Sequence, residues 1–107
     1  MFLDQFYVFF SSDLHAFCGI EKVHVYDGSA LIWPRRLGEK LSGDWSKPRE
    51  VVSPEGAHFS NTWVPRDASG LRLQFNTAFG LSLNVGSILE GEITFHSAGC
   101  NWVDTAG

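Results

Sequence analysis

Several short segments of this chain alternate between apolar and polar residues, and residues typical of turns separate them. Lys22–Tyr26 alternates, Asp27-Gly28-Ser29 supplies the positive φ that a tight hairpin needs, and Ala30–Trp33 returns. Leu71–Phe75 and Leu81–Val85 alternate in the same way. Strands that recur about every 8–12 residues are typical of sandwiches and barrels. We therefore expect a mainly β fold: an antiparallel sandwich or small barrel-like sheet with at most one or two short helices.

The first part of the chain is less regular. Residues 2–10 (FLDQFYVFF) favour a strand buried on both faces, although phenylalanines at helical spacing leave a helix as the competing interpretation. A polar residue before Leu14 is expected to cap a short helix over Leu14–Cys18. Pro34 is expected to end the strand that begins at Ala30, because proline has no N–H to donate to a central ladder.

The middle of the chain, from Arg35 to Gly56, is polar and interrupted by glycine and proline. We expect one helical turn around Leu37–Leu41 and a short edge strand at Glu50–Val52. A broken segment held by strands on both sides is a common place for functional residues.

The second half predicts a meander of strands. His58–Val64 is expected to be a strand that ends at Pro65, and the tail Asn101–Gly107 is expected to fray. Glu90 and Glu92 are expected to share the outer face of the last strand. The residues expected to face the core from this half include Leu71, Leu73, Phe75, Leu89, Gly91, Ile93 and Phe95.

Size and charge limit the classes of function. A chain of 107 residues is the size of one domain, so we expect residues 1–107 to form a single unit. Its 44% hydrophobic and 19% charged residues are the balance of a globular rather than a disordered chain. The net charge of −4 argues against nucleic acid as a partner, because phosphate binding needs a basic face.

The charges are unevenly distributed. All eight Lys and Arg residues lie between Lys22 and Arg72, so both ends of the chain carry acids without bases. If the two ends meet in space, they form an acidic surface that would steer a basic partner. The alternative is that the acids only keep a small protein soluble.

The compartment is inferred from the first residues and the cysteines. The apolar start has no basic segment, and Asp4 interrupts it, so we predict no secretion signal. No apolar run approaches the roughly 20 residues of a membrane helix. We expect a cytoplasmic protein that does not bind membranes and keeps Cys18 and Cys100 as free thiols.

The candidates for catalysis and metal binding are weak. His15 precedes Cys18 and His96 precedes Cys100 at spacings that would suit zinc or a Cys–His nucleophile, but both segments are acidic and lack the turns of known sites. Two outward glutamates on one strand face resemble a glycosidase pair only in their separation of about 7 Å. Phosphate-cradling and dinucleotide motifs are absent. We therefore expect no catalytic residues, no metal and no cofactor.

Tryptophan and arginine gather around the broken middle segment. Trp33-Pro34-Arg35-Arg36 and Trp63-Val64-Pro65-Arg66 share a pattern, in which an aromatic residue near a strand end is followed by proline and arginine. These residue types dominate binding hot spots, and both strand ends could present them at one rim of the sheet. Trp45, beside Gly43 and Asp44 in a predicted loop, is harder to explain as a core residue.

The most economical hypothesis is a small protein-binding module. It would be an inhibitor or immunity-type protein that neutralises a toxin or enzyme by covering its active site, and the acidic charge favours a basic target. The alternatives are a carbohydrate- or small-ligand-binding β module, a structural subunit of a phage or other assembly, and an enzyme that uses the His and Cys groups. The residues expected to contact a partner are Trp33, Arg35, Arg36, Trp45, Arg66, Glu90 and Glu92.

Overall fold

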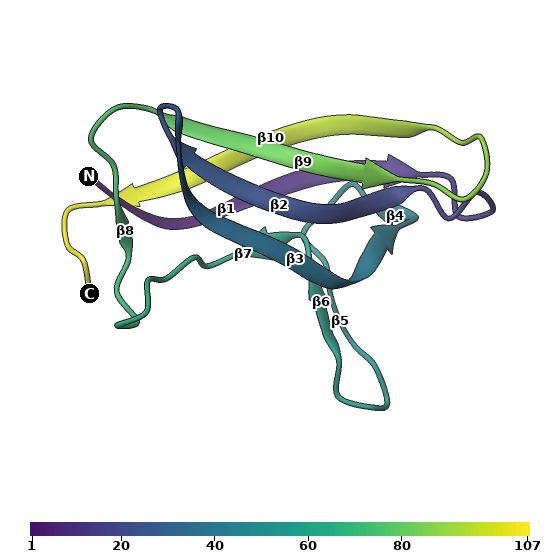
Figure 1. The fold of residues 1–107 in the computed structure, drawn as a ribbon. Helices are drawn as coiled ribbons and strands as arrows, with labels where there is room; N and C mark the ends of the chain where they lie inside the picture. The colour runs from purple at the N-terminus through teal and green to yellow at the C-terminus, as the bar shows by residue number, and fades with distance from the viewer.

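The computed structural model describes all 107 residues, and all of its regular secondary structure is β-strand (Figure 1). It contains no helix of the length and hydropathy needed to cross a membrane. The strands are β1 (Phe2–Ser12), β2 (Gly19–Asp27), β3 (Ala30–Ser42), β4 (Asp44–Trp45), β5 (Glu50–Val52), β6 (His58–Ser60), β7 (Thr62–Trp63), β8 (Leu73–Gln74), β9 (Phe79–Gly86) and β10 (Ile93–Val103).

The strands form two main sheets and one small hairpin. In the first sheet β10 pairs along one side of β1, and the short strands β4, β7 and β8 pair at successive positions along its other side. In the second sheet β2 lies between β3 and β9. β5 and β6 form a hairpin that projects from these two sheets (Figure 1). Every pair is antiparallel, so the predicted mainly β, antiparallel fold is confirmed.

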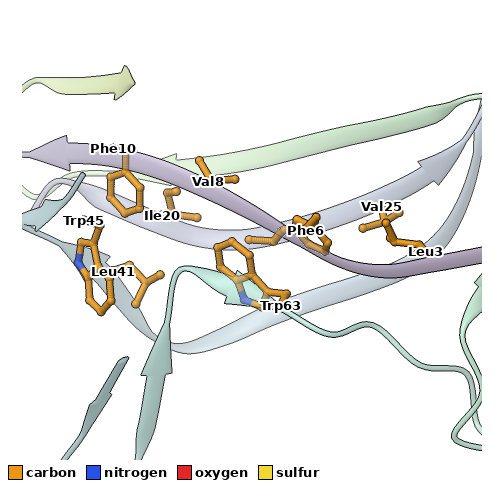
Figure 2. Close-up of a cluster of buried hydrophobic side chains, with 10 residues drawn as sticks. Leu3, Phe6, Val8, Phe10, Ile20, Val25, Leu41, Trp45 and Trp63 are labelled. Atoms are coloured by element: carbon orange, nitrogen blue, oxygen red, sulfur yellow. The ribbon is translucent and has the colours of Figure 1, made fainter. Parts of the chain in front are cut away.

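The core lies between β1 and β2. Leu3, Phe6, Val8 and Phe10 of β1 are all buried, and they pack against Ile20, Val23 and Val25 of β2 (Figure 2). Full burial of side chains of this size contributes about 1.5–3 kcal/mol each, so this seam is the main source of stability. The predicted strand over residues 2–10 is confirmed. Its predicted burial on both faces is wrong, because residues between the buried ones, such as Tyr7 and Phe9, are only half-buried.

β3 is much longer than its sequence suggested. Gly28 does adopt a positive φ of 62° in the turn before it, as the hairpin required. Pro34 does not end the strand, which continues to Ser42. β3 is an edge strand, and an edge strand tolerates proline because half of its backbone groups need no partner. The predicted helical turn around Leu37–Leu41 is wrong, because β3 continues through these residues.

Other local predictions are corrected by tertiary packing. Leu14–Cys18 forms a turn instead of a helix. His58–Val64 is divided into β6 and β7 at the buried Asn61, whereas the short strand Glu50–Val52 is confirmed. Four expected core residues are exposed instead: Leu71, Leu89, Gly91 and Phe95.

The last strand also begins later than predicted. Because β10 starts at Ile93, Glu90 and Glu92 lie in the loop before it and do not share a strand face. The tail does not begin at Asn101, since β10 extends to Val103 and the Arg72 backbone N–H donates to the Ala106 carbonyl, with N and O 2.8 Å apart.

Candidate protein-binding groove

One face of β3 lines a groove of about 1120 Å³ that opens beside the edge of the second sheet. Side chains alternate along a strand, so every second residue of β3 faces this space. The residues of this face that line the groove are Trp33, Arg35, Leu37, Glu39 and Leu41. From the first to the last of them the strand rises about 26 Å at roughly 3.3 Å per residue. The groove is therefore long enough for an extended peptide.

The opposite wall comes from β6, β7 and the residues that follow them. Phe59, Trp63, Val64 and Arg66 line this side. This wall depends on the break between β6 and β7 at Asn61. After the break, β7 leaves the β5–β6 hairpin and pairs with β1, where Trp63 lies opposite Phe6. The β5–β6 hairpin, which projects from the two sheets (Figure 1), also lines the groove through Glu50, Ala57 and His58.

The two tryptophans are held in place by the same core ring. Trp63 stacks on Phe6 with ring centroids 5.2 Å apart, and Trp33 meets Phe6 edge-on at 6.0 Å. Trp63 is only 8% exposed, whereas Trp33 is half-buried. Aromatic contacts of this kind contribute about 0.5–1.5 kcal/mol beyond area burial. The groove thus has a rigid aromatic base, which limits the entropy lost when a partner binds.

The two arginines of the groove differ in their partners. Arg66 Nη1 donates to the backbone oxygens of Asp4 at 3.0 Å and Pro65 at 2.8 Å, and Arg72 shares the same aspartate through a 2.9 Å bond from Nε to Oδ1. Arg66 is thus held by the chain itself. Arg35 is exposed and forms no ion pair, so it is the cation available to a ligand.

The rim also carries negative charge. Glu39 lies on β3, and Glu50 lies on β5, where its Oε1 is 2.6 Å from Nε2 of His58. Both partners of this pair are exposed, so it contributes little to stability. Since the groove mixes both signs of charge, it suits the backbone and mixed side chains of a protein segment better than a uniformly charged ligand.

Trp45 lies elsewhere and has a structural position. It is 5% exposed, its Nε1 donates to the Ser42 carbonyl at 2.9 Å, and the Arg49 guanidinium carbon lies 4.6 Å from the ring centroid. Figure 2 shows it beside Leu41 and Phe10 at one end of the core. The expectation that a loop position would keep this residue out of the core is therefore wrong. Short strand β4 turns its ring inward.

The remaining predicted residues are not brought to the groove. Arg36 is exposed, and it follows Arg35 on the strand, so its side chain takes the opposite face of β3. Glu90 and Glu92 lie in the loop between β9 and β10, where they line a polar hollow with Asp13.

The His and Cys residues do not assemble into a metal site. No group of three or more His, Cys, Asp or Glu side chains is placed to hold a metal ion. Cys18 is buried, Cys100 lies on β10 opposite Phe6, and His96 is hydrogen-bonded with Ser11, with Nε2 and Oγ 3.0 Å apart.

The sequence did not predict Leu37, Glu39 and Phe59 as groove residues. The signal for the first two was the alternation from Trp33 to Leu41, which becomes visible once Pro34 is allowed inside an edge strand. Phe59 has no comparable signal, because its position depends on the hairpin.

Comparison with protein-family models, with curated proteins and with solved structures finds no match to this chain in any of the three.

Proposed function

We propose that this protein is a binding module that holds an extended segment of a partner protein in the groove between β3 and β6–β7. The observation that carries the proposal is the combination of an unpaired strand edge with a lined groove beside it. β3 pairs only with β2, and its groove-facing side chains alternate from Trp33 to Leu41. An extended segment can add to such an edge through backbone hydrogen bonds while its side chains enter the groove.

The size of the groove favours a polypeptide over a small molecule. Its volume of about 1120 Å³ exceeds the usual upper range of small-molecule pockets, about 1000 Å³. Stacking on a sugar ring would need exposed indole faces, whereas Trp45 and Trp63 are buried and Trp33 is half-buried. We therefore favour a protein partner over a carbohydrate.

The biological role we propose is that of an inhibitor or immunity-type protein. The anchored Trp33 and the free Arg35 are residue types that dominate tight interfaces. The net charge of −4 suits association with a basic enzyme or toxin. The module would neutralise such a target by covering its active site.

The test uses two adjacent arginines on opposite faces of the same strand. Arg35→Glu reverses a charge in the groove, and Arg36→Glu makes the same change outside it. We expect one stoichiometric partner from the native host to be retained by the wild type and by Arg36→Glu and to be lost by Arg35→Glu. In the complex, hydrogen exchange of the β3 amides should slow. Retention by Arg35→Glu, or loss by both variants, would refute the groove as the binding site.

The inhibitory role is tested on the captured partner. If the partner is an enzyme, its activity should fall to zero at one equivalent of the wild-type protein and should be unaffected by Arg35→Glu. Full activity of the partner in the saturated complex would reject inhibition while leaving the binding function intact.

A further inference from the structure

Phe17 has an unfavourable backbone and an exposed ring. It is the one residue other than glycine with a positive φ, 51°, and its side chain is 59% exposed. A left-handed backbone is costly for a residue with a large side chain, and an exposed aromatic ring forgoes the gain of burial. Backbone strain of this kind concentrates at functional sites. Packing does not account for a phenylalanine here.

Three more apolar side chains are exposed at the same end of the molecule. Leu14 lies in the same turn, while Ile88 and Leu89 lie in the loop between β9 and β10, and Ile88 is 72% exposed. The backbone N–H of Ile88 donates to the Ala16 carbonyl at 3.0 Å, which fixes the loop against the turn. Figure 1 shows both connections at one end of the sheets. We call Leu14, Phe17, Ile88 and Leu89 the apolar end.

A pocket of about 470 Å³ adjoins the apolar end. This volume lies within the usual range of about 300–1000 Å³ for binding pockets. One side belongs to the apolar end and the other to the segment around β4–β6. The apolar side chains that line it include Leu14, Phe17, Ile88, Trp45, Val51 and Phe59. It can therefore receive an apolar side chain of a partner.

The free charges beside the apolar end are acidic. Asp13, Glu90 and Glu92 line a neighbouring polar hollow, and none of them forms an ion pair. The pocket itself carries Glu39 and two bases: Lys40 Nζ donates to the Phe17 carbonyl at 2.9 Å and pairs with Glu21 at 3.5 Å, and Arg49 Nη1 donates to the Asp44 carbonyl at 3.0 Å. With Asp13, Glu90 and Glu92 beside it, the combined charge of these groups is acidic.

This charge pattern selects the kind of partner. A second copy of the chain docked end to end would place like charges together. An anionic membrane surface would be repelled for the same reason. A protein segment that carries an apolar side chain beside Lys or Arg complements both the apolar pocket and the acidic hollow next to it.

We propose that the apolar end is a second interaction surface, which receives a protein segment carrying an apolar side chain flanked by Lys or Arg. The apolar side chain enters the pocket beside Phe17, and the basic residues meet Asp13, Glu90 and Glu92. The pocket adjoins the groove and shares Glu39, Leu41 and Phe59 with it, whereas Phe17, Ile88 and the acidic hollow lie outside the groove.

The test begins with a displayed random-peptide library selected on the immobilised full chain. We expect enriched peptides that combine Leu, Phe, Ile or Trp with Lys or Arg and that shift the amide resonances of residues 13–18 and 87–92. Ile88→Ser, or the pair Glu90→Lys and Glu92→Lys, should weaken binding roughly tenfold or more. Val52→Ser, which alters an equally exposed apolar residue on β5, and Arg35→Glu should leave it unchanged.

Several results would overturn the proposal. These are enrichment of peptides without basic residues, unchanged affinity of Ile88→Ser, and binding of anionic phospholipid vesicles through the same residues. Peptides that bind through Arg35 instead would support the groove and reject the apolar end.

Phe17→Asn separates function from folding, since asparagine tolerates a left-handed backbone. We expect its Tm to equal or exceed that of the wild type while peptide affinity falls roughly tenfold or more. A lower Tm together with unchanged affinity would show that Phe17 serves only folding.

Discussion

The side-chain amide of Asn61 donates a hydrogen bond to the backbone carbonyl of Trp45, with Nδ2 and O 3.1 Å apart. The same nitrogen reaches the Lys47 carbonyl at 2.9 Å, and Oδ1 accepts from the Arg49 backbone N–H at 3.0 Å. Asn61 is fully buried between β6 and β7. One side chain therefore connects the groove wall to the segment that covers the end of the core.

Replacing this side chain should be costly. Asn61→Ala leaves three backbone groups without their partners, and we expect the free energy of unfolding to fall by about 3 kcal/mol or more. Urea denaturation measures the loss. Asn76→Ala, on an exposed loop, is the matched control and should change stability by less than about 0.5 kcal/mol. A similar small change for Asn61→Ala would show that the amide is not a structural clamp.

Trp45→Ala should act on stability. Removing a buried indole from a core typically costs about 3–5 kcal/mol, and here it also removes the hydrogen bond to the Ser42 carbonyl. Chemical denaturation should show this loss, and Arg35-dependent binding should persist in the folded fraction. A variant of near wild-type stability would contradict the core position of this ring.

Asp27 makes stability depend on pH. Its carboxylate accepts backbone N–H bonds from Asn76, Thr77 and Ala78 at 2.8–3.1 Å, and the bond from Asn76 is the largest cause that lowers the pKa of Asp27 below its usual 3.8. A pKa that is lower in the folded state adds stability above the unfolded value, and this stability is lost as the pH falls through the folded value.

Asp27→Asn should therefore be less stable than the wild type at neutral pH. The difference should narrow as the pH falls below about 4, which thermal unfolding across a pH series would show. Glu55→Gln, at an exposed position without an ion pair, should give no such trend. A difference that stays constant down to about pH 2 would mean that the carboxylate charge has no role.

Gly19 is required by the close approach of β2 and β3. A Cβ at this position would collide with the backbone carbonyl oxygen of Leu41. Gly19→Ala should force the strands apart and cost about 1–3 kcal/mol. Gly38→Ala places its methyl group in open space and should be neutral or slightly stabilising. Equal melting temperatures for the two variants would show that the strands can separate without cost.

Local patterns predicted the strands well where one face is buried. The alternation in β2 and β9 and the turn at Gly28 were visible in the sequence, because each depends on near neighbours in the chain. The length of β3 was not visible in the sequence. A strand can continue through Pro34 only if it lies at the edge of a sheet, and edge position is a property of the whole sheet.

The candidate sites were predictable only in part. The repeated Trp–Pro–Arg pattern led to Trp33, Arg35, Trp63 and Arg66, which the structure brings to one groove. The apolar end could not be foreseen. Leu89 has the spacing of a core residue, and its exposure depends on the hydrogen bonds that hold its loop against Ala16.

The central position of β1 has a consequence for synthesis of the chain. β1 is made first and its longest partner last, with Phe2 opposite Val103. At roughly 5–20 residues per second, the backbone edge of β1 that pairs with β10 waits on the order of ten seconds for that strand to emerge. Sheets closed by such distant pairings fold slowly, and the waiting segment is rich in phenylalanine. The first sheet can therefore be completed only after β10 has been made.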